Sequence, residues 1–202
     1  MEVNATLVKE LREKTGAGMM DCKKALAETA GNLEKAVDYL RQKGLAAAAK
    51  KADRVATDGA VGAYVHPGGK IGVLVEINCE TDFVARTNEF QSLLKDIAMQ
   101  VAAASPRFLR REEVSGEELE KERSIYRQQA LESGKPEKVV DKIVEGKMER
   151  FYSEACLLEQ AFIKDPDQKV LDVVNDAAVR WREQIQVRRS ARFHLGEVVE
   201  KS

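Results

Sequence analysis

The sequence predicts an α+β protein: an N-terminal module of three short helices, then a small antiparallel sheet packed with helices, plus a helical hairpin. Of the 202 residues, 33% are charged and only 5% are aromatic, which favours long amphipathic helices over a β-sandwich. Most of the chain carries apolar residues at three- and four-residue steps. Residues 59–79 differ, because they hold two apolar, β-branched runs around a glycine-containing turn.

The first helices are delimited by residues with strong end preferences. Asn4 is a plausible N-cap for the first helix, and Gly16 lies just past its end. Gly31 stops the second helix and Asn32 caps the third. Tight glycine turns between short helices predict a compact module over residues 1–55, which ends in an alanine-rich linker helix and resembles a ubiquitin-associated domain.

The next segment predicts an antiparallel hairpin over about 59–79, with its turn at residues 67–70. Residues 88–104 then have helical spacing and present a wide apolar stripe that can cover one face of the hairpin. The stripe consists of Phe90, Leu93, Leu94, Ile97 and Val101.

Residues 80–87 connect the second strand to this helix and read Glu-Thr-Asp-Phe-Val-Ala-Arg-Thr. We call them the TDF loop, after Thr81, Asp82 and Phe83. An acid and a large aromatic ring on a connector indicate a functional site, because loops carry function more often than packed elements. The simpler alternative is that Phe83 packs locally and Asp82 helps to cap the following helix.

The second half of the chain predicts more helices and one further strand. Helices over about 115–132 and 137–158 are separated by Ser-Gly-Lys-Pro and form a hairpin. A helix over 170–182 is followed by a strand over about 185–195. The whole of residues 56–202, with helices from about 88 to 182, is the expected core and dimerisation domain. The expected buried face of the helix over 170–182 consists of Leu171, Val174, Ala178 and Trp181.

Charge and cysteine usage exclude several classes of protein. The formal net charge of -1 argues against the whole chain acting as a polycation on nucleic acid. Cys22, Cys79 and Cys156 lie far apart without metal-ligand spacing, so we expect buried, reduced thiols rather than disulfides or a zinc site. No basic region precedes an apolar run, and no run is long enough to cross a membrane. We expect a cytoplasmic protein.

Two long motifs, at residues 7–26 and 80–87, together resemble the translation elongation factor Ts family. Weaker similarity runs through residues 133–136, 144–148 and 192–196, so the resemblance covers nearly the whole chain. Members of this family are nucleotide exchange factors for elongation factor Tu. The chain resembles the family's short form, with a single copy of a core that long members duplicate.

The resemblance implies a role for the TDF loop. It places Thr81, Asp82, Phe83 and Val84 against the G domain of elongation factor Tu, near its magnesium site, with Phe83 as a wedge between partner side chains. In this interpretation the chain displaces an ion rather than holding one. We therefore expect no metal and no cofactor.

The resemblance also implies a second contact with the G domain, through Arg12, Met19, Met20 and Lys23. Two adjacent residues at the start of a helix cannot both face inward, so at least one methionine should be exposed. Methionine suits adaptable apolar contacts. Isolated basic residues on a helix, such as Arg12 and Lys23, are more often simply solvated.

The sequence contains no pattern that indicates covalent catalysis or nucleotide binding by the chain itself. Neither His66 nor His194 belongs to a nucleophilic triad, and no glycine-rich phosphate-binding loop follows a strand. Glu76, Glu80 and Asp82 could be considered as magnesium ligands, but their places on a strand and a loop fit an octahedral site poorly. We expect an exchange factor rather than an enzyme.

A different class of function is RNA binding. Residues 107–111 and 180–193 interleave arginines with aromatic rings, and the second stretch has five arginines against a single acid, Glu183. The alternative is that these arginines form local ion pairs, and we expect no direct nucleic-acid contact.

We expect a homodimer as well as the partner elongation factor Tu. A sheet of two or three strands is marginal alone and leaves edges open to pairing. The missing second copy of the core suggests that another chain supplies it.

Overall fold

The computed structural model describes residues 4–15, 17–49, 54–134 and 136–198, and it confirms the α+β class. The chain divides into two compact units, each built from three segments of the sequence. The first unit comprises Met1–Ala60, Ile77–Phe90 and Asp172–Gln186. The second comprises Val61–Glu76, Gln91–Leu171 and Val187–Ser202.

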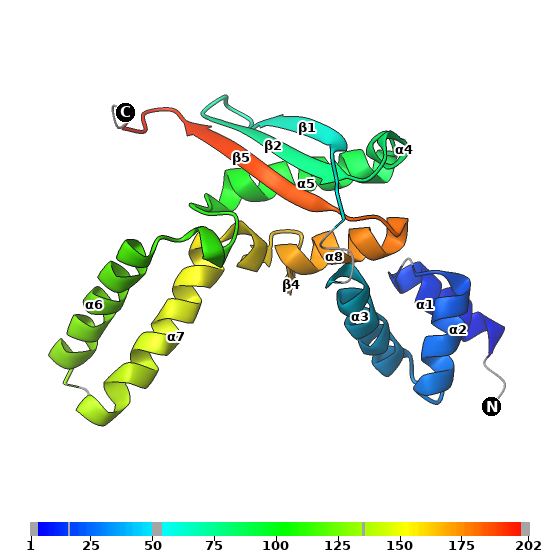
Figure 1. Cartoon of the computed structure of the whole chain (residues 1–202), viewed down its shortest axis with the longest axis horizontal. Coiled ribbons are helices and arrows are strands. Elements are labelled where there is room, and N and C mark those ends of the chain that lie inside the picture. Colours follow the sequence, from blue (N-terminus) through cyan, green and yellow to red (C-terminus); the bar gives the residue numbers. More distant parts are fainter. Residues whose placement is uncertain (1–3, 16, 50–53, 135, 199–202) are drawn as a thin grey trace. The chain divides into compact units, whose positions relative to one another are not determined.

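Three helices form the N-terminal module, namely α1 (Ala5–Thr15), α2 (Met19–Glu28) and α3 (Leu33–Ala49), drawn in blue in Figure 1. Both predicted asparagine caps are confirmed. The side-chain oxygen of Asn4 accepts the Thr6 N–H at 2.9 Å, and that of Asn32 accepts the Lys35 N–H at 2.9 Å. The alanine-rich linker helix is the continuation of α3, whereas Gly16 lies outside the described residues.

The module has its own small core, to which all three helices contribute a buried face. Its buried residues are Val8, Leu11, Cys22, Ala25, Leu26 and Ala36.

The sheet has three strands in the order β1-β2-β5, so the predicted C-terminal strand is confirmed. They are β1 (Asp58–Val65), β2 (Ile71–Cys79) and β5 (Gln186–His194). Backbone bonds from His66 N–H to the Ile71 carbonyl at 2.9 Å and from Leu195 N–H to the Lys70 carbonyl at 2.8 Å show that both neighbours of β2 run antiparallel to it.

Helix α5 (Asn88–Ala104) has the predicted bounds and lies along one face of the sheet (Figure 1). All five residues of its predicted stripe are buried, as are alternate residues of β2, Val73, Val75 and Ile77. Gly62 of β1 permits this close packing, because a Cβ at that position would lie 2.6 Å from Cγ of Leu94.

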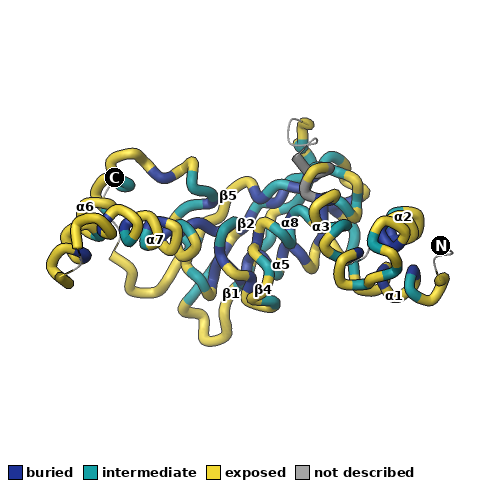
Figure 2. The backbone as a smooth tube through the Cα atoms, turned by 90° about the horizontal axis from the view of Figure 1, so that it is seen from below, coloured by how far each residue is buried: buried dark blue, intermediate teal, exposed yellow. Residues whose placement is uncertain are grey.

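Helices α6 (Gly116–Glu132) and α7 (Glu137–Ala155) form the predicted hairpin around a separate hydrophobic cluster. Figure 2 shows α6 mostly exposed, with Ala130 as its buried residue, whereas buried residues recur along α7 at helical spacing, as expected for an amphipathic helix. Helix α7 ends earlier than predicted because Cys156 is extended, and a 3-10 turn, η2 (Leu157–Glu159), follows.

Arg111, in the 3-10 turn η1 (Arg111–Glu113), holds the C-terminal end of α7. Its guanidinium pairs with Glu159 and with Glu149 and lies 4.5 Å from the ring centroid of Tyr152. The hydrogen bonds from Arg111 lower the pKa of Glu159 below its ordinary value.

Two features between α7 and β5 differ from the prediction. A short antiparallel pair, β3 (Ala161–Phe162) and β4 (Asp165–Lys169), occupies a stretch for which the sequence predicted no helix or strand. Helix α8 (Val170–Trp181) buries Val174 and Ala178 as expected, but Trp181 is only partly buried and Leu171 is 40% exposed. The helix is turned slightly, so that the buried stripe includes Val170 and Ala177 and leaves Leu171 at its flank.

No helix in the described part of the chain combines the length and the apolar character needed to cross a membrane.

Candidate partner-binding site

The TDF loop contains one helical turn, α4 (Asp82–Ala85), which follows directly on β2. Thr81 is extended and caps this turn, since its hydroxyl accepts the Val84 N–H at 3.4 Å. The hydroxyl of Thr87 accepts the Phe90 N–H at 3.2 Å at the start of α5. The capping role considered for Asp82 is therefore taken by two threonines.

The turn divides the loop into an outer and an inner side. Phe83 is 79% exposed, so its ring does not pack locally in the free chain. Asp82 is also exposed, and its carboxylate pairs with the Arg86 guanidinium at 2.9 Å. Val84 and Ala85 are buried. The loop consequently presents Asp82 and Phe83 to solvent, while Val84 anchors the turn from within.

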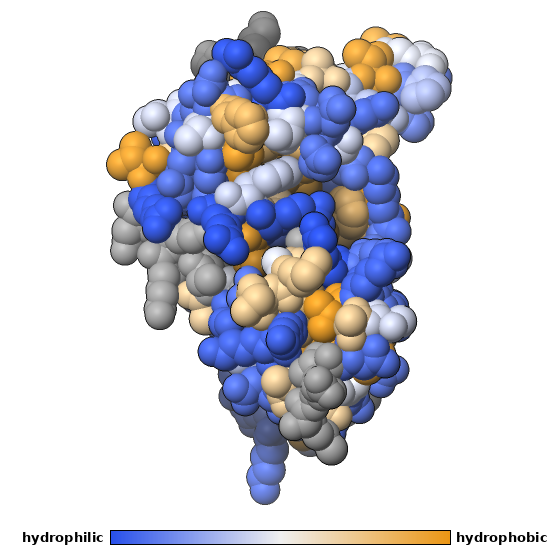
Figure 3. All heavy atoms as spheres, turned by 90° about the vertical axis from the view of Figure 1, so that its right-hand side faces the viewer, coloured by the Kyte–Doolittle hydropathy of each residue, from blue (hydrophilic) through white to orange (hydrophobic). Residues whose placement is uncertain are grey.

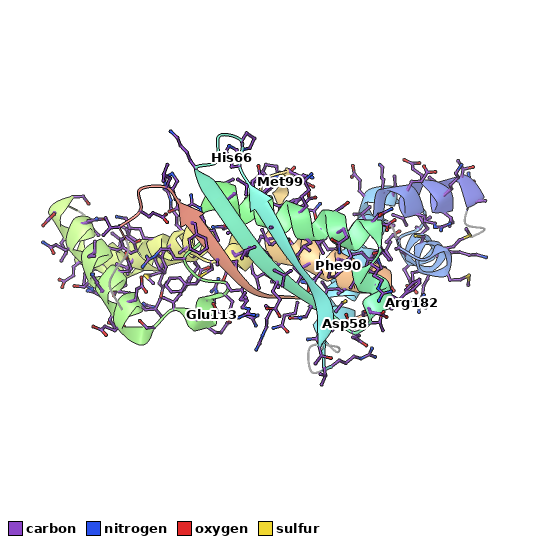
Figure 4. The ribbon with its side chains drawn as sticks, turned by 90° about the horizontal axis from the view of Figure 1, so that it is seen from above. Asp58, His66, Phe90, Met99, Glu113 and Arg182 are labelled. Carbon is purple, nitrogen blue, oxygen red and sulfur yellow. The ribbon has the colours of Figure 1, made fainter. Side chains whose placement is uncertain are left out.

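The base of the loop is bound by Glu183, in the connection between α8 and β5. One carboxylate oxygen accepts the N–H groups of Glu80 at 3.0 Å and Thr81 at 3.1 Å, and the other accepts the Thr81 hydroxyl at 2.6 Å. In return, the carboxylate of Glu80 accepts the Gln184 N–H at 2.7 Å. Figure 4 shows the end of the sheet at which this contact lies, where Asp58, Phe90 and Arg182 are labelled, with His66 at the other end of the hairpin.

Sequence reasoning missed Glu183 and Gln184 as partners of the loop, because more than 100 residues separate Glu183 from Thr81. One signal was present. Glu183 is the only acid in the arginine-rich stretch over 180–193, and an isolated acid among cations suggests a specific local task.

Cys79 lies beneath the same part of the loop. Its thiol is buried and donates to the Thr81 carbonyl at 3.1 Å. Burial, reinforced by the nearby carboxylate of Glu183, raises the pKa of this thiol to about 11. The thiol therefore stays protonated at neutral pH and acts as a hydrogen-bond donor.

Both predicted docking methionines are exposed at the start of α2, Met19 by 57% and Met20 by 76%. Cys22 and Leu26 occupy the buried side of the same helix. Figure 3 shows one face of the molecule, on which hydrophobic residues are scattered among hydrophilic ones. The other two predicted contacts, Arg12 on α1 and Lys23 on α2, are exposed as well.

The three acids considered as metal ligands each face a separate arginine. Glu76 pairs with Arg189 at 2.6 Å and Glu80 with Arg54 at 3.3 Å, while Asp82 pairs with Arg86. Within the described residues, no three side chains of histidine, cysteine, aspartate or glutamate cluster in a way that could hold a metal ion.

Several arginines considered for RNA binding are engaged in local pairs. Arg107 pairs with Glu118, and Arg192 pairs with Glu197 at 3.0 Å. Arg111 and Arg189 pair with the acids described above. These pairs occupy guanidinium groups that an RNA backbone would need, which favours the local-ion-pair interpretation.

Comparison with known proteins adds independent information about the chain. Residues 5–197 match the family described as elongation factor TS. An elongation factor Ts from Desulforamulus reducens is 62% identical over 200 residues, which cover 99% of this chain and 92% of the relative. An elongation factor Ts from Geobacter sulfurreducens is 62% identical over 201 residues, which cover 100% of this chain and 93% of the relative.

Proposed function

The chain belongs to the elongation factor Ts family, and we propose that it promotes the release of GDP from elongation factor Tu during translation elongation. The observation that carries the mechanism is the exposure of Phe83 on a capped turn. A large aromatic ring held in solvent is a feature of a surface that awaits a partner.

We infer that Phe83 acts as a wedge in the G domain of elongation factor Tu. Nucleotide affinity in a phosphate-loop protein depends on a magnesium ion and a loop held in strict geometry, so a small displacement weakens several contacts together. Burying a phenyl ring yields roughly 1.5 to 3 kcal/mol, and each tenfold gain in release rate requires about 1.4 kcal/mol. Insertion of one ring can thus account for a substantial part of the acceleration.

The neighbours of Phe83 have separate roles in this proposal. Asp82 brings a carboxylate close to the magnesium site, where it perturbs the charge around the ion. Thr81 begins the turn at the edge of the same interface. Val84, the remaining predicted contact, is buried in the free chain and fixes the direction in which Phe83 points.

The N-terminal module supplies docking energy in this proposal. Met19 and Met20 present adaptable apolar surface to the G domain, and Arg12 and Lys23 add charge at its rim. By linkage, the chain must weaken GDP binding by the same factor by which GDP weakens binding of the chain. No covalent bond is made or broken, so the activity is exchange rather than enzymatic conversion.

The activity is tested by mixing the chain with elongation factor Tu loaded with fluorescent GDP and following release against excess unlabelled GDP. We expect a release rate that rises with the concentration of the chain. A rate independent of that concentration, with the partner shown to be active by its intrinsic exchange, would contradict the proposal.

We also propose that the domain over residues 56–202 forms a homodimer through the sheet. Along β1 and β2, exposed residues alternate with more buried ones that face α5. Because successive side chains of a strand point to opposite faces, the exposed apolar ones project from the face of the sheet opposite α5. The side chain of Arg192 reaches the Ala102 carbonyl on α5, so the next residue along β5 projects the other way. The exposed apolar residues of this outer face are Val61, Val65, Leu74 and Phe193.

A further inference from the structure

We propose that Glu183 is a positioning residue for exchange, which holds the TDF loop in the shape that presents Phe83. The inference rests on the proposed exchange function. It concerns a residue outside the loop, in the connection that links α8 to β5.

The first support is the number and kind of donors that one carboxylate binds. Glu183 accepts two consecutive backbone N–H groups and one hydroxyl, from Glu80 and Thr81, all within 3.1 Å. Hydrogen bonds to an ionised acceptor are stronger than neutral ones. Three of them fix the direction in which the chain leaves β2.

The second support is reciprocity. The carboxylate of Glu80 accepts the backbone N–H of Gln184 at 2.7 Å, so each segment binds the backbone of the other through a glutamate. This pair of reciprocal hydrogen bonds resembles a capping box, in which each of two residues accepts a backbone N–H of the other through its side chain. Here the two residues belong to distant parts of the chain. Neither segment can shift without breaking bonds to the other.

The third support is a relay through Thr81. Its hydroxyl donates a hydrogen bond to the Glu183 carboxylate at 2.6 Å. That bond leaves an oxygen lone pair directed at the Val84 N–H, so that the hydroxyl caps α4. A helix of four residues has little stability of its own, because nucleation is unfavourable. The turn that carries Phe83 therefore depends on the cap, and the cap is oriented by Glu183.

The backbone before Glu183 is shaped for this contact. Arg182 has a φ of 57°, the left-handed conformation in which chains commonly leave a helix. The chain thereby turns away from α8, and the carboxylate of the next residue meets the loop. Because Arg182 is not glycine, contacts on both sides must hold it in this conformation.

Amide hydrogen exchange in the free chain tests the contact without any partner. Glu183→Ala should speed exchange at residues 82–87, and Glu183→Gln, which keeps one oxygen acceptor, should have a smaller effect. Glu145→Ala, which removes an exposed glutamate from α7, is the control. Hydrogen exchange in α7 should be the same in the unmodified chain and in both Glu183 variants, which shows that any change is local. Glu145→Ala should leave hydrogen exchange at residues 82–87 unchanged. Unchanged exchange at residues 82–87 in Glu183→Ala would overturn the inference.

A double-mutant cycle with Phe83→Ala tests the role of Glu183 in nucleotide exchange. In the chain that retains Phe83, Glu183→Ala should slow stimulated GDP release roughly three- to tenfold, with partial rescue in Glu183→Gln. In the Phe83→Ala background the same change should have little effect, because there is no ring left to position. Equal effects in both backgrounds would show a general structural role and would overturn the inference.

The two proposals fail in distinguishable ways. If Phe83→Ala released GDP as fast as the unmodified chain, the wedge would be wrong and the role of Glu183 in exchange would fall with it. The hydrogen-exchange experiment would then still decide whether Glu183 holds the loop. If Phe83→Ala were slow and Glu183→Ala were not, only the positioning role would be wrong.

Discussion

The ring of Trp181 packs against that of Phe90, with centroids 5.8 Å apart and planes inclined by 48°. Phe90 lies in the first turn of α5, just after the TDF loop, and is fully buried. Trp181 is two residues before Glu183, which binds the other end of the loop. One short segment therefore holds both ends of the loop, and the exposed ring of Phe83 lies between two fixed points.

Two phenylalanines seven residues apart should thus respond oppositely to truncation. Phe83→Ala should leave the thermal midpoint nearly unchanged, because little of its ring is buried in the free chain. It should slow stimulated GDP release by about ten- to a hundredfold, through loss of roughly 1.5 to 3 kcal/mol of insertion energy. Thermal unfolding and release of fluorescent GDP measure the two quantities.

Phe90→Ala is the matched control. It removes a buried ring and should destabilise the chain by about 3 to 5 kcal/mol. If Phe83→Ala instead unfolded early while its folded fraction released GDP normally, the wedge would be refuted.

The methionine pair should govern docking more than release. Replacing Met19 and Met20 together by alanine should weaken binding to elongation factor Tu roughly tenfold or more, since two apolar side chains lose their burial in the complex. The rate at saturating concentration should change little, because the TDF loop is intact. Titration of the exchange rate separates the two effects, as the half-saturating concentration reports docking and the plateau reports release.

Val55→Ala serves as the control for removing apolar surface, because Val55 is as exposed as Met20. Docking that stayed as tight in the double methionine variant as in this control would remove α2 from the proposed interface.

The elements that sequence analysis predicted best are those whose signal is local. Helix α5 has the predicted bounds because a continuous apolar stripe fixes its face and Ser-Pro ends it. The caps at Asn4 and Asn32 could also be predicted from the sequence, because a capping side chain binds a backbone N–H only two or three residues away.

The features that were missed depend on contacts between distant parts of the chain. The β3–β4 pair lies in a stretch that contains Asp-Pro-Asp, whose local preference is for a turn. The stretch is a strand because of its antiparallel pairing with β3, which local preference does not predict. The orientation of α8 is set by packing, which left Leu171 exposed. The contact between Glu183 and Thr81 has no sequence periodicity that could predict it.

The proposed dimer can be tested at the outer face of the sheet. Light scattering at micromolar concentration should give about twice the 22.5 kDa mass of one chain. Leu74→Lys should yield the monomer mass, because burying an unpaired charge in the interface is more unfavourable than the association of the two sheets is favourable. The result should not depend on reductant, since Cys22, Cys79 and Cys156 are all buried.

Leu131→Lys on α6 is the matched control, because Leu131 is exposed to a similar extent as Leu74 but lies on the helical hairpin. The monomer mass for the unmodified chain would count against the dimer, and equal loss of dimer in both variants would count against the sheet as its interface.

The buried thiols should make stability fall at high pH. Burial raises the pKa of Cys79 and of Cys156 from the ordinary value of 9.0 to about 11. Between these values the unfolded chain loses the thiol protons while the folded chain keeps them, so the folded state binds more protons and the free energy of unfolding decreases as pH rises. Below pH 9 these groups leave stability independent of pH.

Thermal midpoints at pH 7.5, 9, 10 and 11 should therefore decline more steeply for the unmodified chain than for Cys79→Ala. The comparison with the variant is needed because tyrosines and lysines also titrate in this range. Cys79→Ala should start lower at pH 7.5, having lost a buried side chain, and the two curves should converge towards pH 11. The carboxylate of Glu183 contributes to the raised pKa of Cys79, so Glu183→Gln should lower that pKa, make the decline shallower and end it at a lower pH. Parallel curves for Cys79→Ala and the unmodified chain would show that the Cys79 thiol titrates alike in the folded and unfolded states.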